Sequence, residues 1–410
     1  MKVVLVHNFL RSSGPSGENL TYQEERDLLR KYGHEVIEFT ASNDDLERSR
    51  WKGGLRAAFA APWNFSAASR LRAILQKEQP QVVHVHNTFP LLSPSVFYAA
   101  RGLPCATVLT LHNYRIFCAA GVPLRDGSPC IECLEKHSSL PALKYGCYRG
   151  SRVATLPLSL SVALHRTMGT WEKEVDAFVC LSDFQLELMA RAGLPEGALS
   201  VKPPCYLEAP LPRPWADRDD KVVFVGRLGR EKGASFLLEA WRLWGDSAPL
   251  LEVIGEGPEE THLRGLVQEF GIADRVVFRG RLPFNEGQEL LGRAKAVAVP
   301  SISYEGFPLV IREAFALGVL VVGSRIGSIQ TLVAEGVNGA LFEPGDPADL
   351  FSVTRRVWSD DGQMRVLGLG ARATFDAKYT ADLNHETLMR IYDGAIARRQ
   401  ARLASRERAS

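Results

Sequence analysis

Residues 300–318, PSISYEGFPLVIREAFALG, constrain the fold more than any other stretch of the chain. They follow the apolar run 296–299, which is typical of a buried parallel strand. After a polar turn, Pro308 stands where a helix can begin without losing a hydrogen bond, and Gly318 predicts a left-handed end to that helix. Residues 309–317 are apolar nearly all round, so the helix is expected to be buried.

Two carboxylates make this stretch a candidate binding site. Glu313 lies in the helix that is expected to be buried, and Glu305 lies eight residues earlier in the turn. A buried carboxylate is costly unless it is paired, and the adjacent Arg312 should not face Glu313 on a helix. The partner of Glu313 is therefore a neighbouring backbone group or the hydroxyl groups of a ligand. Exposed N–H groups of Gly306 and Phe307, at the positive end of the helix, would suit an anion.

These motifs carry a family resemblance. E-G-F-P-L-V followed by E-A-F-A-L-G, with the glutamates at E-x7-E spacing, resembles the signature of retaining glycosyltransferases of the GT-B fold. The chain is most similar to the large family 4 type, which contains bacterial sugar transferases and relatives of sucrose and glycogen synthases. The resemblance implies an α/β GT-B fold, with two doubly wound Rossmann-like domains facing a central cleft. It also implies that Glu305 holds hydroxyls of the transferred sugar and Glu313 holds the ribose.

Length and composition fit a globular protein of two or three domains. The 410 residues are 46% hydrophobic and 23% charged with a net charge of +2, which is too weak a basic bias for a nucleic-acid binder. No apolar run reaches the roughly 18 residues of a membrane span, and the N-terminus has no signal-peptide pattern. Seven cysteines without a secretion signal argue against a disulfide framework, so the expected location is cytoplasmic.

Proline marks the expected domain boundary. Residues 203–214, PPCYLEAPLPRP, contain five prolines, which no regular element can accommodate. We therefore expect an acceptor-side domain over 1–202, a linker over 203–214 and a nucleotide-sugar-binding domain over 215–385. Residues 386–410 are expected to form a helix that crosses back to the first domain, with a solvated or frayed arginine-rich tail from Arg398.

The first strand, 2–6, is followed by a glycine loop and a helix over 18–32. Such a loop lies at the carboxyl end of a strand, where open α/β sheets bind ligands. The family resemblance implies two adjacent glycines near the donor phosphates. The matching pair here is Ser16-Gly17, so Gly17 alone carries over.

Three histidines follow predicted strands of the first domain. His84 and His86 share one face of the strand 81–87, because side chains alternate along a strand. They could ligate a metal, but the sequence offers no third ligand nearby, and hydrogen-bonded strand-end histidines are the favoured interpretation. His112 ends the strand 106–111, where it could meet substrate. The resemblance, carried by T-L-H-N-Y-R, implies a histidine beside the reacting sugar on the acceptor side.

Residues 113–150 lack clear periodicity and contain four cysteines: Cys118, Cys130, Cys133 and Cys147. Thiolates with a C-x2-C pair at the centre fit a tetrahedral structural zinc, which would order a long irregular stretch. Four unconnected thiols in a packed loop are an alternative, and redox chemistry is a third interpretation. The sequence around the cysteines resembles a subset of bacterial polysaccharide-assembly glycosyltransferases.

Two stretches of the first domain combine apolar and basic residues. Residues 51–75 alternate aromatics with lysine and arginine, and residues 144–164 are basic and apolar. Packing of a helix and loop against the first domain is the favoured interpretation of 51–75. The alternative is peripheral contact with an anionic membrane at its inner face.

The second domain carries the expected donor site. Arg227 and Lys232, in G-R-L-G-R-E-K-G after the strand 221–225, precede a helix as a phosphate-binding pair should. Read alone they could equally be solvated charges, whereas the resemblance implies a pyrophosphate clamp. Gly255 and Glu256, in G-E-G-P, could approach a base or ribose. Leu282 lies in a loop where family members hold the base. The family's usual Gly-Gly-x-Pro-Glu reads Gly-Ser-Ile-Gln-Thr over 327–331, without its proline and glutamate.

The sequence as a whole predicts a retaining glycosyltransferase. Its expected donor is a UDP- or GDP-sugar and its expected acceptor a glycan or lipid-linked molecule. No catalytic metal is expected, because Arg227 and Lys232 would neutralise the leaving diphosphate. One alternative is a nucleotide-sugar epimerase on the same fold. The other is a non-catalytic assembly partner with a residual nucleotide site.

Overall fold

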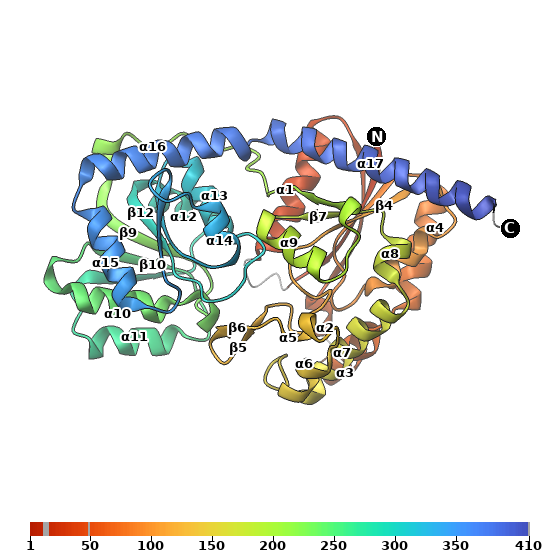
Figure 1. The fold of residues 1–410 in the computed structure, drawn as a ribbon, viewed down its shortest axis with the longest axis horizontal. Coiled ribbons are helices and arrows are strands. Elements are labelled where there is room, and N and C mark those ends of the chain that lie inside the picture. Colours follow the sequence, from red (N-terminus) through yellow and green to blue (C-terminus); the bar gives the residue numbers. More distant parts are fainter. Residues whose placement is uncertain (11–15, 48–49, 409–410) are drawn as a thin grey trace. The chain divides into compact units, whose positions relative to one another are not determined.

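The computed structural model describes residues 1–10, 16–47 and 50–408, and these form two compact units (Figure 1). The first unit comprises Met1–Pro123, Ile131–Leu207 and Ala381–Ser410. The second comprises Leu124–Cys130 and Glu208–Thr380. Each unit has its own parallel sheet and its own apolar core between sheet and helices. The predicted fold class of two doubly wound Rossmann-like domains is confirmed.

Within the described ranges, the sheet of the first unit has six parallel strands in the order β2-β1-β3-β4-β7-β8. Val4 of β1 pairs with Ile37 of β2 on one side and Val83 of β3 on the other, so the strand order reverses at β1. Open sheets bind ligands in the crevice at such a reversal. The strands are β1 (Lys2–Phe9), β2 (Glu35–Ser42), β3 (Val82–Asn87), β4 (Ala106–Thr110), β7 (Ala177–Cys180) and β8 (Leu199–Val201).

The second unit, all of whose residues are described, has six parallel strands in the order β11-β10-β9-β12-β13-β14. Numbered along the chain, this is the order of dinucleotide-binding sheets. It reverses between β9 and β12, so the loops after these strands border the expected crevice. The strands are β9 (Asp219–Val225), β10 (Leu250–Ile254), β11 (Val276–Gly280), β12 (Ala294–Val299), β13 (Leu320–Ser324) and β14 (Gly339–Phe342).

Helices cover both sheets, and several begin at a side chain that accepts a hydrogen bond from the first turn, such as Ser16 and Ser151. The helices of the first unit are α1 (Gly17–Lys31), α2 (Asp44–Glu47), α3 (Arg50–Ala60), α4 (Phe65–Glu78), α5 (Glu132–Glu135), α6 (Leu140–Tyr145), α7 (Arg152–Thr167), α8 (Thr170–Glu174), α9 (Asp183–Arg191) and α17 (Ala381–Glu407). Those of the second unit are α10 (Ala234–Trp244), α11 (Glu260–Glu269), α12 (Phe284–Arg293), α13 (Leu309–Ala316), α14 (Gly327–Leu332), α15 (Pro347–Trp358) and α16 (Asp361–Lys378).

Helix α13 is the helix that the sequence predicted to be buried. It begins directly after Pro308, and its residues from Ile311 to Ala316 are buried. It ends before Gly318, whose φ of +64° is the left-handed conformation expected there. Both its burial and its left-handed end are therefore confirmed.

Segment 113–150 is more regular than the sequence suggested. It contains α5, α6 and a short hairpin formed by β5 (Leu124–Arg125) and β6 (Ser128–Pro129). These elements are each six residues or shorter, too short to show a hydrophobic period in the sequence.

The C-terminal helix α17 lies against the sheet of the first unit (Figure 1). Leu388, Tyr392 and Ala395 pack in the same apolar core as the strands β1, β3, β4 and β7. The prediction that the tail from Arg398 is solvated or frayed is wrong. Arg399 is only 1% exposed and donates to the carbonyl oxygens of Leu103 and Ala100.

Candidate functional site

The loops after β9 and β12 interlock in the second unit. The backbone N–H of Ile302 donates to the carbonyl of Glu231 over 3.0 Å. Gly233 has a φ of +68°, and a Cβ placed on it would lie 1.9 Å from the carbonyl oxygen of Pro300. Any other side chain would push the two loops apart. Glycine at this position therefore lets the loop carrying Lys232 touch the loop that precedes α13.

This contact brings together two predicted site residues. Lys232 Nζ lies 2.6 Å from Oε2 of Glu305, and Ser301 Oγ donates to the other carboxylate oxygen. The Lys232 side chain is 27% exposed and that of Glu305 is 15% exposed. Arg227 lies on the same loop and is more exposed, and it pairs with Glu231. Each predicted phosphate-binding cation therefore contacts a carboxylate of its own domain.

The loop after β10 packs on the same region. The carbonyl of Glu256 accepts from the N–H of Leu228, and the N–H of Gly255 donates to Gly280 at the end of β11. A Cβ on Gly255 would lie 1.9 Å from the carbonyl of Gly226, so this glycine is also required by close backbone approach. The side chain of Glu256 is exposed. Leu282 is half-buried, two residues beyond β11.

Glu313 has a protein partner that the sequence did not reveal. It is 7% exposed and accepts a hydrogen bond of 2.9 Å from Nε2 of Gln288 on α12. Arg312 Nη2 lies 3.9 Å from its other oxygen, at the outer limit of an ion pair. The prediction of exposed N–H groups at Gly306 and Phe307 is not supported, because both residues are buried. Bulk explains this, because the Phe307 ring packs edge-on against Tyr379.

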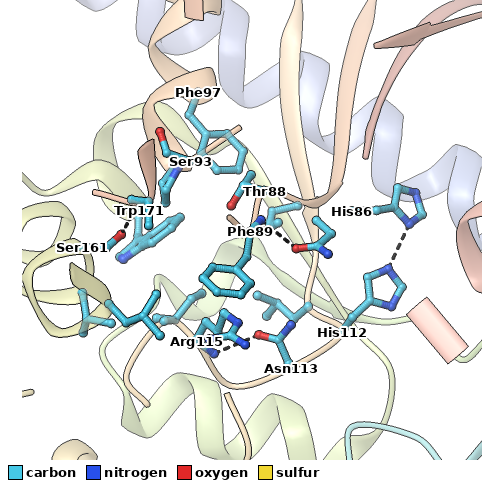
Figure 2. Close-up of a pocket in the computed structure, with 18 of the residues that line it drawn as sticks. His86, Thr88, Phe89, Ser93, Phe97, His112, Asn113, Arg115, Ser161 and Trp171 are labelled. Atoms are coloured by element: carbon cyan, nitrogen blue, oxygen red, sulfur yellow. Dashed lines mark hydrogen bonds between the residues drawn. The ribbon is translucent and has the colours of Figure 1, made fainter. Parts of the chain in front are cut away.

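The first unit contains a cavity of about 90 Å³ at the carboxyl ends of β3 and β4 (Figure 2). His86 and His112 line one side of it, and Trp171 and helix α7 line the other. Arg115 lies with its guanidinium 4.0 Å from the centre of the Phe89 ring. Arg115 also donates to the carbonyl of Ala119, which fixes the cation at the cavity wall.

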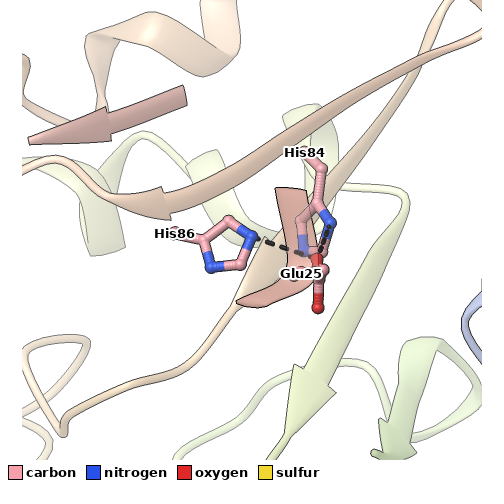
Figure 3. A group of neighbouring side chains, drawn as sticks. All are labelled: Glu25, His84 and His86. Carbon is pink, nitrogen blue, oxygen red and sulfur yellow. Dashed lines mark hydrogen bonds and ion pairs between the residues drawn. The ribbon is translucent and has the colours of Figure 1, made fainter. Parts of the chain in front are cut away.

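His86 connects this cavity to a buried network centred on Glu25 of α1 (Figure 3). Glu25 Oε1 lies 2.8 Å from Nδ1 of His84 and 3.1 Å from Nε2 of His86. Its Oε2 lies 2.6 Å from Nζ of Lys202. His86 Nδ1 in turn lies 3.0 Å from Nε2 of His112. A continuous chain of polar contacts thus runs from the Glu25–Lys202 ion pair to the predicted acceptor-side histidine.

Other elements complete the network. The hydroxyl of Tyr392 on α17 lies 2.8 Å from Nδ1 of His84, and Oγ1 of Thr110 lies 2.7 Å from its Nε2. Lys202 also donates to Asn384 of α17. The network therefore ties the C-terminal helix to the centre of the first sheet.

Glu25, His84 and His86 also satisfy the spacing of a metal site, since their ligand atoms lie within 4.8 Å of one another. Glu25 is the third potential ligand that the sequence did not show. However, an ammonium 2.6 Å from its carboxylate already balances the negative charge and would repel a divalent cation. We therefore interpret the group as a hydrogen-bonded ion-pair network.

Donor and acceptor bookkeeping assigns the protons of this network. A carboxylate only accepts, so Nε2 of His86 carries the hydrogen that Glu25 receives. Because Lys202 already balances Glu25, the neutral imidazole of His86 then accepts at Nδ1. His112 must donate to it from Nε2, which leaves Nδ1 of His112 as an acceptor.

Burial controls the charge states here. Burial lowers the pKa of His84 to about 4 and, in the same sheet, that of His7 to about 3. Burial, followed by the neighbouring His86, holds the pKa of His112 well below its usual value. Burial alone would raise the pKa of Glu25, but Lys202 and the imidazoles hold it well below its usual range. The ring that faces the cavity is therefore neutral at pH 7.

Sequence reasoning missed Glu25 and Lys202. Glu25 lies on the buried face of α1 between Tyr22 and Leu28, at helical spacing, so an acid on an apolar face was the available signal. Lys202 directly follows β8, at the carboxyl end of a strand. Gly17 begins α1 behind the capping residue Ser16, and the rest of its predicted loop, residues 11–15, lies outside the described residues.

The four cysteines are all reduced. Cys118 and Cys133 are buried, whereas Cys130 and Cys147 are half-buried. Cys133 and Cys147 belong to one apolar cluster with Ala119. Burial, with a small contribution from Cys133, raises the pKa of Cys118 to about 12. Three of the thiols therefore converge on one part of the first unit, while Cys130 belongs to the second.

Comparison with known families agrees with the fold and with the placement of the motifs. The family described as "Glycosyltransferase Family 4" matches residues 22–206, and "Glycosyl transferases group 1" matches residues 211–373. The two matches fall on the first and second units in turn. The chain therefore belongs to the GT-B glycosyltransferases of the family 4 type.

Relatives share these domains at moderate identity. The D-inositol 3-phosphate glycosyltransferase of Xylanimonas cellulosilytica is 31% identical over 184 residues, which are 44% of each chain. One polypeptide of the phosphatidylinositol N-acetylglucosaminyltransferase of Arabidopsis thaliana is 22% identical over 370 residues, 85% of this chain and 72% of that protein. The chain spans a little under half the length of the inositol-phosphate relatives that it matches.

Solved structures of the same fold cover nearly the whole chain. Anabaena HepE in complex with UDP-glucose has a TM-score of 0.66 and 18% identity, over 96% of this chain and 100% of that one. Sucrose-phosphate synthase from Thermosynechococcus elongatus has a TM-score of 0.68 and 17% identity, over 97% and 99%. Among the described helices, none is long and apolar enough to cross a bilayer.

The buried histidines predict a stability that falls in acid. His84 has a folded pKa of about 4, so the unfolded chain binds an extra proton between pH 4 and about 6.5, the ordinary histidine pKa. Folding should lose about 3 kcal/mol as the pH falls through that window, and His7 acts in the same direction. Calorimetric melting between pH 4 and 8 should show a flatter decline for His84→Gln. The exposed His262 supplies the matched control, since His262→Gln should follow wild type. Equal slopes for all three proteins would refute the assignment.

Proposed function

We propose that the chain is a retaining, metal-independent glycosyltransferase that transfers a sugar from a UDP- or GDP-sugar to a glycan or lipid-linked acceptor. The observation that carries this proposal is the contact between Lys232 and Glu305 at the crevice of the second sheet. It joins the first half of the E-x7-E motif to the predicted diphosphate-binding loop. The complex of Anabaena HepE with UDP-glucose supports the same class of donor.

The chemistry requires positive charge where the diphosphate leaves. Breaking the bond between sugar and diphosphate places negative charge on the phosphate oxygens. Lys232 and Arg227 lie on one loop that leads into the N-terminus of α10, where backbone N–H groups also favour an anion. Cations so placed would stabilise the leaving group without a divalent ion. An incoming phosphate would compete with Glu305 for Lys232, which would release that carboxylate toward the sugar hydroxyls.

The acceptor would bind at the cavity of the first unit. His112 lines it as a neutral ring, with Nδ1 left as an acceptor by the network behind it. A neutral acceptor nitrogen can receive a hydrogen bond from a sugar or acceptor hydroxyl. Arg115 on the same wall would contribute a cation. The resemblance implies retention of configuration, as in other chains with the E-x7-E motif.

The two glutamates should have separable effects on binding and turnover. Glu313→Gln should weaken binding of UDP or GDP by about 10- to 100-fold, because the ribose would lose a hydrogen bond to a charged group. Glu305→Gln should leave nucleoside diphosphate binding close to wild type. Once a substrate is in hand, it should lower kcat and kcat/KM together, because its contact strengthens as the sugar departs. Calorimetric titration of UDP and GDP into both variants measures the first difference.

The exposed Glu269 of α11 provides the control, since Glu269→Gln should bind as wild type does. Glu313 is buried, so the melting temperature of each variant must be recorded with its affinity. Equal losses of affinity in both variants, or a loss confined to Glu305→Gln, would contradict the assigned roles.

We also propose that Cys118, Cys130, Cys133 and Cys147 hold a structural zinc. Reduced thiols that converge in an apolar region suit a tetrahedral thiolate site, which would order segment 113–150. Protein purified without chelators should contain about one equivalent of zinc by elemental analysis. Cys133→Ser should lose it, whereas Cys180→Ser, at a buried cysteine of β7, should keep it. Wild-type protein without zinc would end this proposal.

A further inference from the structure

Helix α7 has two apolar faces on opposite sides. Leu158 and Val162 on the inner face are buried and line the cavity of the first unit. The outer face carries Val153, Leu156, Leu160 and Leu164, which are all exposed, Val153 at 83% and Leu160 at 53%. At 3.6 residues per turn, these four side chains fall within an arc of roughly 80°. The outer face is thus a continuous apolar stripe without a partner in the described part of the chain.

Neighbouring helices extend this surface. Helices α3 and α6 both contact α7 (Figure 1). Ser161 of α7 donates to the carbonyl of Ala61 at the end of α3, and Arg152 donates to the carbonyl of Lys144 on α6. Phe59 on α3 and Leu140 on α6 are exposed by 80% and 70%. The side chains of Trp51 and Lys52, part of the basic aromatic stretch in the sequence, lie outside the described side chains.

The charges around the stripe are of one sign. Residues 136–171 contain five lysines and arginines and no aspartate or glutamate. Lys144, Arg149 and Arg152 are exposed, and no carboxylate of the described residues forms an ion pair with them. Lys144 and Arg149 instead lie over the rings of Tyr145 and Tyr148. An apolar stripe bordered by unpaired cations is the pattern of a helix that lies in a membrane surface.

We propose that the outer face of α7, with α3 and α6, docks onto a bilayer that contains anionic phospholipid. Self-association is disfavoured, because a two-fold contact would place the same cations opposite one another. The surface deepens the proposed function, on which its purpose rests. The inner face of the same helix lines the acceptor-side cavity, so docking would bring a lipid-linked acceptor next to His112.

The test is co-sedimentation of the full chain with vesicles of phosphatidylcholine, alone or mixed with phosphatidylglycerol. Wild type should bind the mixed vesicles at low salt and bind phosphatidylcholine weakly. The triple variant V153S/L156S/L160S should bind at least tenfold more weakly. Lys144→Gln combined with Arg152→Gln should bind the mixed vesicles about 25-fold more weakly, or about fivefold for each charge.

Exposed apolar residues in the second unit supply the matched control. Val366 and Leu369 on α16 are 61% and 64% exposed, and V366S/L369S should bind vesicles as wild type does. All variants should keep the wild-type melting temperature and the wild-type affinity for UDP or GDP. These two readouts separate failure of the surface from failure of the proposed function.

Three results would overturn the proposal. The first is wild type that fails to bind mixed vesicles at low salt. The second is a triple variant that binds as well as wild type. The third is sedimentation velocity showing a wild-type dimer that the triple variant dissociates, because the stripe would then be covered by a second copy.

Discussion

The donor half of the molecule depends on one steric constraint, the close approach of backbone at Gly233 and Gly255. A Cβ at either position would overlap a carbonyl oxygen at 1.9 Å, so both must be glycine for the loops after β9, β10 and β12 to touch. That contact places Lys232 against Glu305 and sets the cationic loop at the start of α10. The charged groups of the site are thus positioned by backbone packing between neighbouring strands, which is stiffer than any single side-chain contact.

The first unit is organised by electrostatics instead. The Glu25–Lys202 pair is almost wholly buried, and removing either partner would leave an uncompensated charge at a cost of about 3–5 kcal/mol. The imidazoles of His84 and His86 and the side chains of Tyr392 and Asn384 satisfy the remaining groups of the pair. The C-terminal helix is therefore part of this core. Its arginines fasten it further, as Arg402 does with the carboxylate of Asp176.

Local patterns in the sequence were enough to predict the strands, the buried helix α13 and the doubly wound fold, because these follow from hydrophobic period and from glycine and proline. The errors have a shared cause. Gln288 meets Glu313, Lys202 meets Glu25, and Arg399 meets the carbonyl of Leu103, each pairing groups far apart in the chain. Such pairs leave no local period. The N–H groups of Gly306 and Phe307 were expected to be exposed, because burial under Tyr379 is again a tertiary effect.

The central claim is that the second unit binds a nucleotide-sugar through its own cations without a metal. Thermal-shift measurement with UDP-, GDP- and ADP-sugars in the presence of EDTA tests it most directly, because a specific ligand raises the melting temperature. We predict that a UDP- or GDP-sugar stabilises the wild-type protein in EDTA and that Lys232→Met abolishes this shift. Stabilisation by none of the sugars, or only when a divalent cation is added, would contradict the claim.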